Sequence, residues 1–456
     1  MSPQALSVRV LSARCSFVLV IEQLFVQIMA EAIKQRETLY KLIISQLHYD
    51  GCEAVAAALA KTTNIISPCP PCARLLEIVN LGLAAEAEGA KPGQTNLPGL
   101  TLPPANDLAT KGIDLEYESD AHSTTPPAAI YETYYVTAHK APCRAASFSP
   151  NGKLVATGSV DSSIKVLDVD RMVAKNTMPQ VHDQGQGMNL ENHPVIRTLY
   201  DHAEEVTALE FHPCAPVLIS GSKDCTVKLF DISKPSVKKA YKAVQEAEVI
   251  NSMSFHPSGD FVLVSTEHPT IRLYDVNTFQ CFVPSNPREY HTEPVTMVKY
   301  APSANLYASC SNDGSIKIWD GVSNRCVATF PKAHNGAEIF SVQFSFNSKY
   351  VISSGKDSLV YLWELATGRA VNMYTGSTMT NYRTQAIFNH TEDFILVADE
   401  KNSSISCWDT RTTEKLKALP SGHNNHIRCL THSPVGAAFV SCSDDFRARF
   451  WYCEGI

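Results

Sequence analysis

The sequence has 456 residues, a formal net charge of −7 and 44 % hydrophobic residues. A chain of this length exceeds one ordinary hydrophobic core, so we expect two or more folded regions. The negative charge argues against non-specific binding to nucleic acid or acidic membranes. The 14 cysteines are scattered, unlike the dense disulfide framework of a short secreted protein. We therefore expect reduced thiols and a cytosolic or nuclear protein.

The first 28 residues precede a second methionine, Met29, which stands just before an amphipathic pattern. The apolar run that begins at Ser16 is interrupted by Glu22, Gln23 and Gln27, and it is too short and too polar to span a bilayer. We expect residues 1–28 to be a disordered extension or to lie before an alternative start, in preference to a targeting signal.

Residues 29–90 have the apolar periodicity of three short helices. Tyr49-Asp50-Gly51 ends the first helix, and Pro70-Pro71 begins the third. Helices that bury so little surface often gain stability by pairing with a second copy, so we expect a dimerisation domain. Packing of these helices on the rest of the chain is the alternative. The residues expected at the dimer interface are Leu39, Leu42, Ile43, Leu47, Leu75 and Val79.

Residues 91–129 are expected to be a linker, because repeated Pro and Gly break regular structure. Within it, residues 114–120 form an acidic stretch with two apolar side chains, Leu115 and Tyr117. We expect this stretch to be solvated, with docking on a basic surface as the alternative.

From residue 130 to residue 456 a spacing pattern returns seven times. In its fourth copy, His291 is followed after 22 residues by Asp313 and after 7 more by Asp320, which closes the sequence Ser-Ile-Lys-Ile-Trp-Asp. Two copies are weaker: one has Glu246 in place of the His, and one keeps Trp408 but has Thr380 in place of the His and Asn402 in place of the Asp. Repeats of about 40–45 residues that end in Trp-Asp are typical of propeller blades. The fold class is therefore mainly β, a seven-bladed WD-repeat β-propeller preceded by a small all-α domain.

The repeated polar residues are expected to stabilise each blade. The Asp lies in a turn where its carboxylate accepts from backbone amides, the His bridges it to neighbouring strands, and the Trp packs between sheets. Seven similar copies cannot all be one active site, so we predict no metal site and no general base here. The expected blade network comprises His139, Asp161, His202, Asp224, His291, Asp313, Trp319, His334, Asp357, Trp363, Trp408, His423, Asp445 and Trp451.

Two further segments of the propeller carry specific expectations. The last Trp-Tyr pair ends only four residues before Ile456, so the final blade lacks an outer strand. Tyr131-Glu-Thr-Tyr-Tyr-Val136 is rich in strand-forming residues and is expected to supply that strand. The polar insertion from about residue 172 to residue 194 is expected to be a mobile loop between the first two blades.

Arg447 departs from the repeat, because most other copies carry Ser or Thr two residues after the turn Asp. We expect it either to pair with a nearby carboxylate or to face a binding partner on the rim of the propeller.

No motif indicates catalysis or a cofactor. The sequence has no phosphate-binding Gly-rich loop, no Gly-x-Ser-x-Gly turn and no paired zinc-ligand helix. Cys69-Pro-Pro-Cys72 has the spacing of a redox motif, but no βαβ pattern surrounds it. We predict that the protein is not an enzyme and binds no cofactor or metal.

Several longer strings resemble the WD-repeat subunit of cleavage stimulation factor. They include Leu39-Tyr-Lys-Leu-Ile-Ile-Ser-Gln-Leu, Gly112-Ile-Asp-Leu-Glu, Ser254-Phe-His-Pro-Ser-Gly-Asp-Phe and Cys442-Ser-Asp-Asp-Phe-Arg-Ala-Arg-Phe-Trp-Tyr. The resemblance runs from about residue 35 to the end and includes linker and loop residues. It implies a nuclear, non-catalytic scaffold in the cleavage and polyadenylation of pre-mRNA 3′ ends.

The same resemblance implies the partners. In that family the helical region makes a homodimer and the propeller binds the large tetratricopeptide-type subunit. Contacts with the C-terminal tail of RNA polymerase II are also attributed to the family, and RNA is contacted only indirectly or weakly. A substrate-recruiting subunit of a ubiquitin ligase, which would bind peptides at the channel mouth, is the alternative function, and direct RNA binding by the propeller face is a third hypothesis.

Overall fold

The computed structural model describes residues 127–177, 193–234 and 236–453 and, ahead of them, Ile44, Leu47, Ala56, Ala60, Lys61, Ile113 and Leu115. The chain divides into two units, residues 1–102 and 103–456. In the first unit all five described residues are helical, and Ile44 and Ala56 are buried. This agrees with the helical character predicted there.

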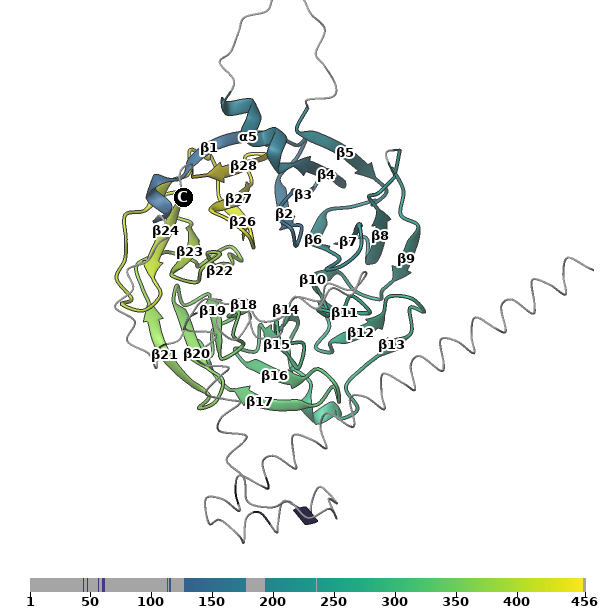
Figure 1. Ribbon diagram of the computed structural model, residues 1–456, viewed down its shortest axis with the longest axis vertical. Helices are drawn as coiled ribbons and strands as arrows, with labels where there is room; N and C mark the ends of the chain where they lie inside the picture. Colours follow the sequence, from purple (N-terminus) through teal and green to yellow (C-terminus); the bar gives the residue numbers. More distant parts are fainter. Residues whose placement is uncertain are drawn as a thin grey trace, which may run out of the picture. The chain divides into compact units, whose positions relative to one another are not determined.

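Residues 103–456 contain a seven-bladed β-propeller, which confirms the predicted fold class. Each blade is a four-stranded antiparallel sheet, and the seven sheets are arranged in a ring (Figure 1) around a cavity lined by their innermost strands. The strands of blades 1 to 3 are β2 (Cys143–Phe148), β3 (Leu154–Ser159), β4 (Ser163–Asp168) and β5 (Val195–Tyr200); β6 (Val206–Phe211), β7 (Val217–Ser222), β8 (Thr226–Asp231) and β9 (Lys242–Gln245); and β10 (Ile250–Phe255), β11 (Phe261–Thr266), β12 (Arg272–Asp275) and β13 (Cys281–Phe282).

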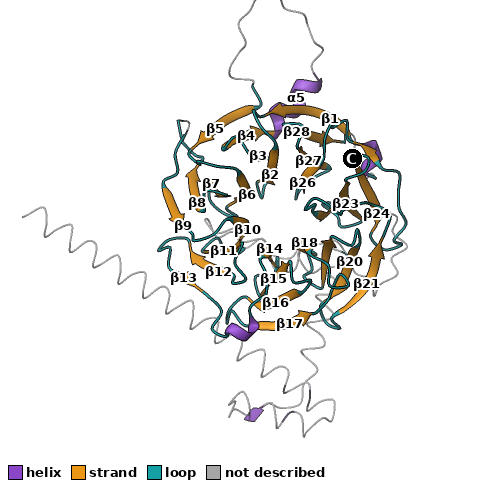
Figure 2. Ribbon diagram, turned by 180° about the vertical axis from the view of Figure 1, so that it is seen from behind, coloured by secondary structure: helices purple, strands orange, loops and turns teal. Residues whose placement is uncertain are grey.

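The remaining blades repeat this order from the channel outward, as the view from behind also shows (Figure 2). The strands of blades 4 to 6 are β14 (Val295–Tyr300), β15 (Leu306–Ser311), β16 (Ile316–Asp320) and β17 (Cys326–Phe330); β18 (Ile339–Phe344), β19 (Tyr350–Gly355), β20 (Val360–Glu364) and β21 (Arg369–Tyr374); and β22 (Ala386–Phe388), β23 (Phe394–Asp399), β24 (Ser404–Asp409) and β25 (Leu419–Pro420). Blade 7 consists of β26 (Ile427–His432), β27 (Ala438–Ser443), β28 (Arg447–Tyr452) and β1 (Glu132–Ala138).

The second strand of each blade is buried on both faces, because it lies between the sheets of two neighbouring blades. All six residues of β19, β23 and β27 are buried. Such strands read as continuous runs of apolar and small residues and do not alternate. Each pair of neighbouring blades therefore shares one layer of the hydrophobic core.

A small residue stands near the end of each second strand, where the next blade approaches most closely. A Cβ added at Gly158 would lie 2.6 Å from Val206 Cγ1, and one added at Gly221 would lie 2.5 Å from Ile250 Cγ2. The equivalent residues in blades 3 to 7 are Ser265, Cys310, Ser354, Ala398 and Cys442. Cys310 and Cys442, at these positions in blades 4 and 7, are buried free thiols.

The ring is closed by β1, which pairs antiparallel with β28 from Glu132 opposite Tyr452 to Ala138 opposite Arg447. The prediction that the segment around Tyr131 to Val136 supplies the missing strand is confirmed. Because the first strand of the propeller completes its last blade, β28 is left with no exposed edge.

The insertion after β4 differs from the prediction. It lies inside blade 1, between β4 and β5, and not between the first two blades. It begins as a helix, α5 (Val169–Thr177), whose Met172 is buried against the core shared with blade 7. Residues 178–192 lie outside the described residues. Val169 and Val173 of this helix also pack, partly buried, against the same cluster. The prediction of a loop fails here because polar residues outnumber these few apolar side chains in the insertion.

Among the described residues, short 3-10 helices include η1 (Ala128–Ile130) before β1 and η3 (Pro287–Glu289) before β14. Ala128 of η1 is buried, although the linker was predicted to run to residue 129. No helix among the described residues is long and apolar enough to cross a membrane.

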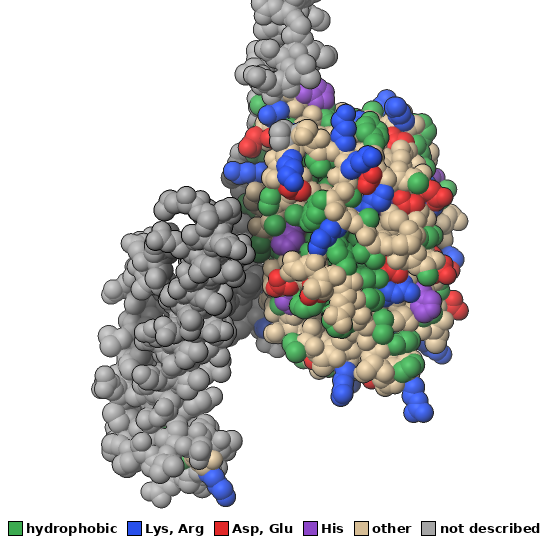
Figure 3. All heavy atoms as spheres, turned by 90° about the vertical axis from the view of Figure 1, so that its right-hand side faces the viewer, with side chains coloured by type: hydrophobic (Ala, Val, Ile, Leu, Met, Phe, Trp, Pro, Cys, Tyr) green, Lys and Arg blue, Asp and Glu red, His purple; other side chains and the backbone are tan. Residues whose placement is uncertain are grey.

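The surface over blades 2 and 3 carries charges of both signs. Figure 3 shows Lys and Arg side chains interspersed with Asp, Glu and hydrophobic side chains on this side of the molecule. A surface of mixed sign lacks the continuous basic stripe that binds a nucleic acid backbone.

Candidate functional site

Four residues form a continuous hydrogen-bonded chain in blade 4. His291 Nδ1 lies 2.9 Å from Asp313 Oδ2, and His291 Nε2 lies 2.7 Å from Ser309 Oγ. Ser309 Oγ also accepts a hydrogen bond from Trp319 Nε1 at 2.8 Å. If Ser309 donates to Nε2 and Nδ1–H donates to the carboxylate, every donor in the chain is satisfied. The network therefore selects a neutral His291.

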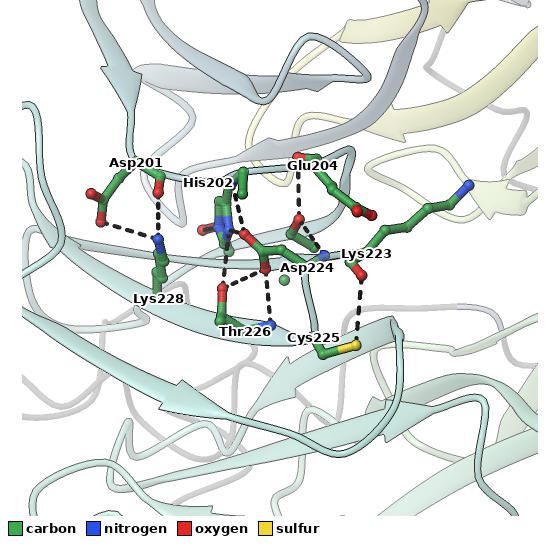
Figure 4. Close-up of polar contacts among 12 residues, drawn as sticks. Asp201, His202, Glu204, Lys223, Asp224, Cys225, Thr226 and Lys228 are labelled. Atoms are coloured by element: carbon green, nitrogen blue, oxygen red, sulfur yellow. Dashed lines mark hydrogen bonds and ion pairs between the residues drawn. The ribbon is translucent and has the colours of Figure 1, made fainter.

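The same chain recurs in blades 5 and 7, and part of it recurs in blades 1 and 2. In blade 2, His202 Nδ1 lies 2.9 Å from Asp224 Oδ2, and Thr226 Oγ1 donates to Asp224 Oδ1 at 2.5 Å (Figure 4). In blade 1, His139 Nδ1 lies 3.1 Å from Ser163 Oγ and 3.8 Å from Asp161 Oδ1. The complete chains of blades 5 and 7 consist of Asp357, His334, Ser353 and Trp363, and of Asp445, His423, Ser441 and Trp451.

In the networks of blades 2, 4 and 7, the pKa shifts favour a neutral His beside an ionised Asp. Burial lowers the pKa of His202 and His291, and it outweighs the carboxylate that would raise it. Burial would raise the pKa of Asp224, but hydrogen bonds from Thr226, the amide of Ala203 and His202 outweigh it and lower that pKa to about 2. Each pair therefore has one fixed charge at neutral pH, and that charge accepts several hydrogen bonds.

The order Asp–His–Ser is also that of a hydrolase triad, but in blade 4 its serine is inaccessible. Ser309 is fully buried, and its Oγ accepts from Trp319, so no substrate carbonyl can reach it. The described residues also contain no group of three or more His, Cys, Asp or Glu placed to hold a metal ion. The arrangement holds strands together and offers no reactive atom.

Blades 3 and 6 replace the chain with other contacts. In blade 3, the buried Glu246 accepts from Arg272 Nη1 at 2.7 Å, and His268 Nδ1 accepts from the amide of Thr270. In blade 6, Trp408 Nε1 donates to the Thr375 carbonyl at 3.1 Å. The sequence shows the positions of the lost residues but not these contacts. Arg272 stands at a position where other blades also carry Lys or Arg, and Thr375 lies outside the repeated marks.

The prediction from the sequence did not include the serines at the centre of each hydrogen-bonded network. Ser220, Ser309, Ser353 and Ser441 each follow the network His by 18 or 19 residues. Their recurrence at that interval was the available signal.

The central channel contains a cavity of about 760 Å³ lined by the innermost strands. Its charged side chains are largely paired: Arg144 lies 3.4 Å from Glu205 and 3.2 Å from Asp444, and Lys223 lies 2.7 Å from Glu205. Arg428 lies 4.4 Å from the centre of the Tyr382 ring. Because these charges neutralise one another, the channel favours neither an anionic nor a cationic ligand.

A segment of the predicted linker packs on blades 5 and 6. Ile113 is 3 % exposed; its N–H donates to Glu392 Oε2 at 2.9 Å, and its carbonyl accepts from Asn347 Nδ2 at 2.6 Å. The amide of Leu115 donates to the Tyr350 hydroxyl at 3.3 Å. We call Ile113 and Leu115 the strap. The expectation of a solvated stretch at residues 114–120 is therefore wrong at Leu115, which is partly buried, while Ile113 lies just before that stretch. The surface that the strap meets is apolar and acidic, not basic.

Glu392 is an unusual partner for the strap. Burial raises its pKa to about 7, although the amides of Ile113 and Phe346 donate to its carboxyl and lower it. Glu392 is 2 % exposed, so the amide of Ile113 in the strap satisfies part of the hydrogen-bonding need of a buried carboxyl.

Arg447 is exposed at the start of β28, and its amide donates to Asp445 Oδ1 at 3.0 Å. Within the described part of the chain, no carboxylate lies at ion-pair distance from its guanidinium. The expected pairing with a nearby carboxylate is therefore not seen there.

Of the residues expected at the dimer interface, only Leu47 is described, and it is half-buried in a helix. The other expected interface residues lie outside the described residues: Leu39, Leu42, Ile43, Leu75 and Val79. Residues 1–28 also lie outside them.

Comparison with known proteins matches both parts of the chain. Residues 31–87 match the dimerisation domain of cleavage stimulation factor subunit 1. The WD domain, G-beta repeat, matches residues 131–168, 194–231, 241–275, 286–320, 324–364 and 414–452. Most of blade 6 falls between the last two matches, in agreement with its missing His–Asp pair.

The chain is 40 % identical over 422 residues to Cleavage stimulation factor subunit 50 of Arabidopsis thaliana, covering 90 % of this chain and 94 % of the relative. More distant similarity joins it to Nuclear distribution protein nudF of Aspergillus niger, at 26 % identity over 56 % of this chain and 60 % of that protein. Striatin-4 of Homo sapiens is 24 % identical over 56 % of this chain and 36 % of that protein. With its dimerisation domain and its WD-repeat propeller, the chain belongs to the family of WD-repeat subunits of cleavage stimulation factor.

Proposed function

We propose that this protein is a non-catalytic nuclear scaffold in the cleavage and polyadenylation of pre-mRNA 3′ ends. One observation carries the proposal: the similarity to a cleavage stimulation factor subunit extends over 90 % of the chain and joins a dimerisation domain to a propeller. The similarity to nudF covers a smaller share, 56 % of this chain.

The mechanism is bivalent. Residues 29–90 pair two copies, the segment from residue 91 to residue 129 connects them to the propellers, and each propeller of residues 130–456 binds one large tetratricopeptide-type subunit. Pairing makes the second binding event intramolecular and raises the effective concentration of the partner, so that two weak contacts become a firm assembly. The tail of RNA polymerase II is a further expected partner, and RNA is reached through the other subunits.

The His–Asp–Ser–Trp chains support this role indirectly. They make the propeller a rigid ring, and a rigid ring presents loops in fixed positions to a partner. Because their reactive atoms are buried and hydrogen-bonded, they contribute stiffness and no chemistry.

Purification of the tagged full chain from nuclear extract tests the proposal. We expect the large subunit of cleavage stimulation factor and the other 3′-end processing factors among the bound proteins. Recovery of ubiquitin ligase core proteins in their place would contradict the proposal and favour the alternative function. Crosslinking of the purified chain alone to GU-rich RNA would contradict the assignment of RNA contact to other subunits.

A further inference from the structure

The turn between β27 and β28 has a side chain that the other blades avoid. Phe446 has φ +70°, in the left-handed region that bulky residues rarely occupy, and it is 46 % exposed. The equivalent residues with positive φ in other blades are all small: Ser162, Cys225, Gly314, Ser358 and Ser403. A strained and exposed aromatic residue is unfavourable for the fold alone.

The next residue adds a second departure. In blades 1, 2 and 4 the residue two positions after the turn Asp is Ser163, Thr226 or Ser315, whose hydroxyl donates to that Asp at 2.5–2.6 Å. Arg447 replaces this hydroxyl in blade 7 and contributes only its backbone amide to Asp445. The fold thus gives up a hydrogen bond in the same turn that holds a strained Phe446.

Positive charge surrounds this turn. Arg447 lies opposite Ala138 in the β1–β28 pair, and the amide of His139 donates to the Phe446 carbonyl at 2.8 Å, which places Lys140 next to the turn. Lys165 donates to the Ala138 carbonyl, and Arg449 donates to the Gly422 carbonyl at 2.7 Å. We call Lys140, Lys165, Phe446, Arg447 and Arg449 the rim patch.

The carboxylates near the rim patch are already engaged. Both oxygens of Asp445 accept hydrogen bonds, from the amide of Arg447 and from His423, and Asp161 accepts from Ser163 and the amide of Lys140. The four cations of the rim patch therefore exceed the negative charge beside them. A surface of this kind complements a segment that carries carboxylates around one apolar side chain.

We propose that the rim patch is the place where the propeller takes an acidic segment of the large subunit, with an apolar side chain of that segment against Phe446 and its carboxylates on Arg447 and Lys140. This inference rests on the proposed function. Arg and aromatic residues are the side chains most enriched at the energetic centres of interfaces. Single-stranded RNA is less favoured, because only one aromatic ring is present and stacking platforms use several.

The test compares a full-length double variant, which restores the pattern of the other blades, with a full-length control variant. The double variant Phe446→Gly, Arg447→Ser relieves the strained turn and returns the missing hydroxyl, so it should melt at the same temperature as the unaltered chain or higher. Its Kd for the purified large subunit should rise at least tenfold. Ser403→Gly, the control in the matching turn of blade 6, should leave the Kd within twofold. Binding of the unaltered chain should weaken more between 50 and 300 mM salt than binding of the double variant.

Each other outcome overturns the inference in a distinguishable way. If the unaltered chain fails to bind the large subunit, the proposed function fails and the inference with it. If the unaltered chain binds and the double variant binds within twofold, only the inference fails. A lower melting temperature of the double variant would mean that Phe446 and Arg447 serve the fold, and lost binding to oligouridine with unchanged subunit binding would make the patch an RNA site.

Discussion

Glu132 lies opposite Tyr452, so the first strand of the propeller and the last are antiparallel neighbours in one sheet. Just before this pair, Tyr131 is 5 % exposed, and its ring centre lies 5.2 Å from that of Phe439. The closure of the ring thus depends on one buried aromatic residue as well as on a strand ladder.

We expect Tyr131→Ala to lower the free energy of unfolding by about 3–5 kcal/mol, the usual loss for a large buried aromatic side chain. Urea denaturation of the full chain measures it. Tyr200→Ala, at a tyrosine that is 58 % exposed, is the control and should cost less than about 1 kcal/mol. Equal losses for the two variants would show that closure of the ring by β1 does not depend on Tyr131.

Gly221 is expected to tolerate no side chain, although its φ is ordinary, because a Cβ would lie 2.5 Å from Ile250 Cγ2 on the next blade. Gly221→Ala should destabilise the propeller by roughly 1–3 kcal/mol through overpacking. Gly436→Ala has open space around the new Cβ and should be neutral or slightly stabilising. Thermal denaturation measures the melting temperatures of the two variants. An unchanged melting temperature for Gly221→Ala would refute the close approach of blades 2 and 3.

The network histidines predict a pH dependence. Burial lowers the pKa of His202, so this group adds stability above its unfolded pKa near 6.5, and that stability is lost as the pH falls. In His202→Gln this titration is absent. The variant should therefore be less stable than the unaltered chain at pH 8, and the difference should shrink towards pH 5. Other titrating groups, including Glu392, cancel in this difference. Denaturant midpoints at several pH values measure it, and a gap that widens on acidification would mean that His202 is charged in the folded protein.

The strap should be protected in solution. The amides of Ile113 and Leu115 donate to Glu392 and Tyr350, so their hydrogen exchange should be slowed. Ile113→Asp would put a charge into the core formed by blades 5 and 6, and it should raise the exchange rate of both residues at least tenfold while the blades stay folded. Ile130→Asp, at an exposed position near the start of the propeller, should leave these rates unchanged. Fast exchange of both amides in the unaltered chain would show that the strap is not docked.

The repeats predicted the propeller well because each blade needs the same residues in the same places. A turn Asp such as Asp313 must follow its His by the length of two strands, and that requirement is visible as a fixed interval. Ring closure followed from counting strands, since a blade that ends at Tyr452 lacks one.

The remaining features depend on contacts between segments that share no period. Ile113 is one apolar residue among many in a linker, and its burial depends on Glu392 and Asn347 from different blades. The helix α5 contributes a single buried side chain to the core, Met172, which a polar insertion conceals. In blade 3 the role of the lost His passes to Glu246 and Arg272, a pair that only the folded sheet brings together.

Sedimentation of the chain with and without residues 35–90, alone and with the large subunit, tests the central claim most directly. The account predicts a dimer of twice the monomer mass for the full chain and a folded monomer for the shortened one, each binding one large subunit per propeller. A shortened chain that remains dimeric, or a propeller that fails to bind the large subunit, would contradict it.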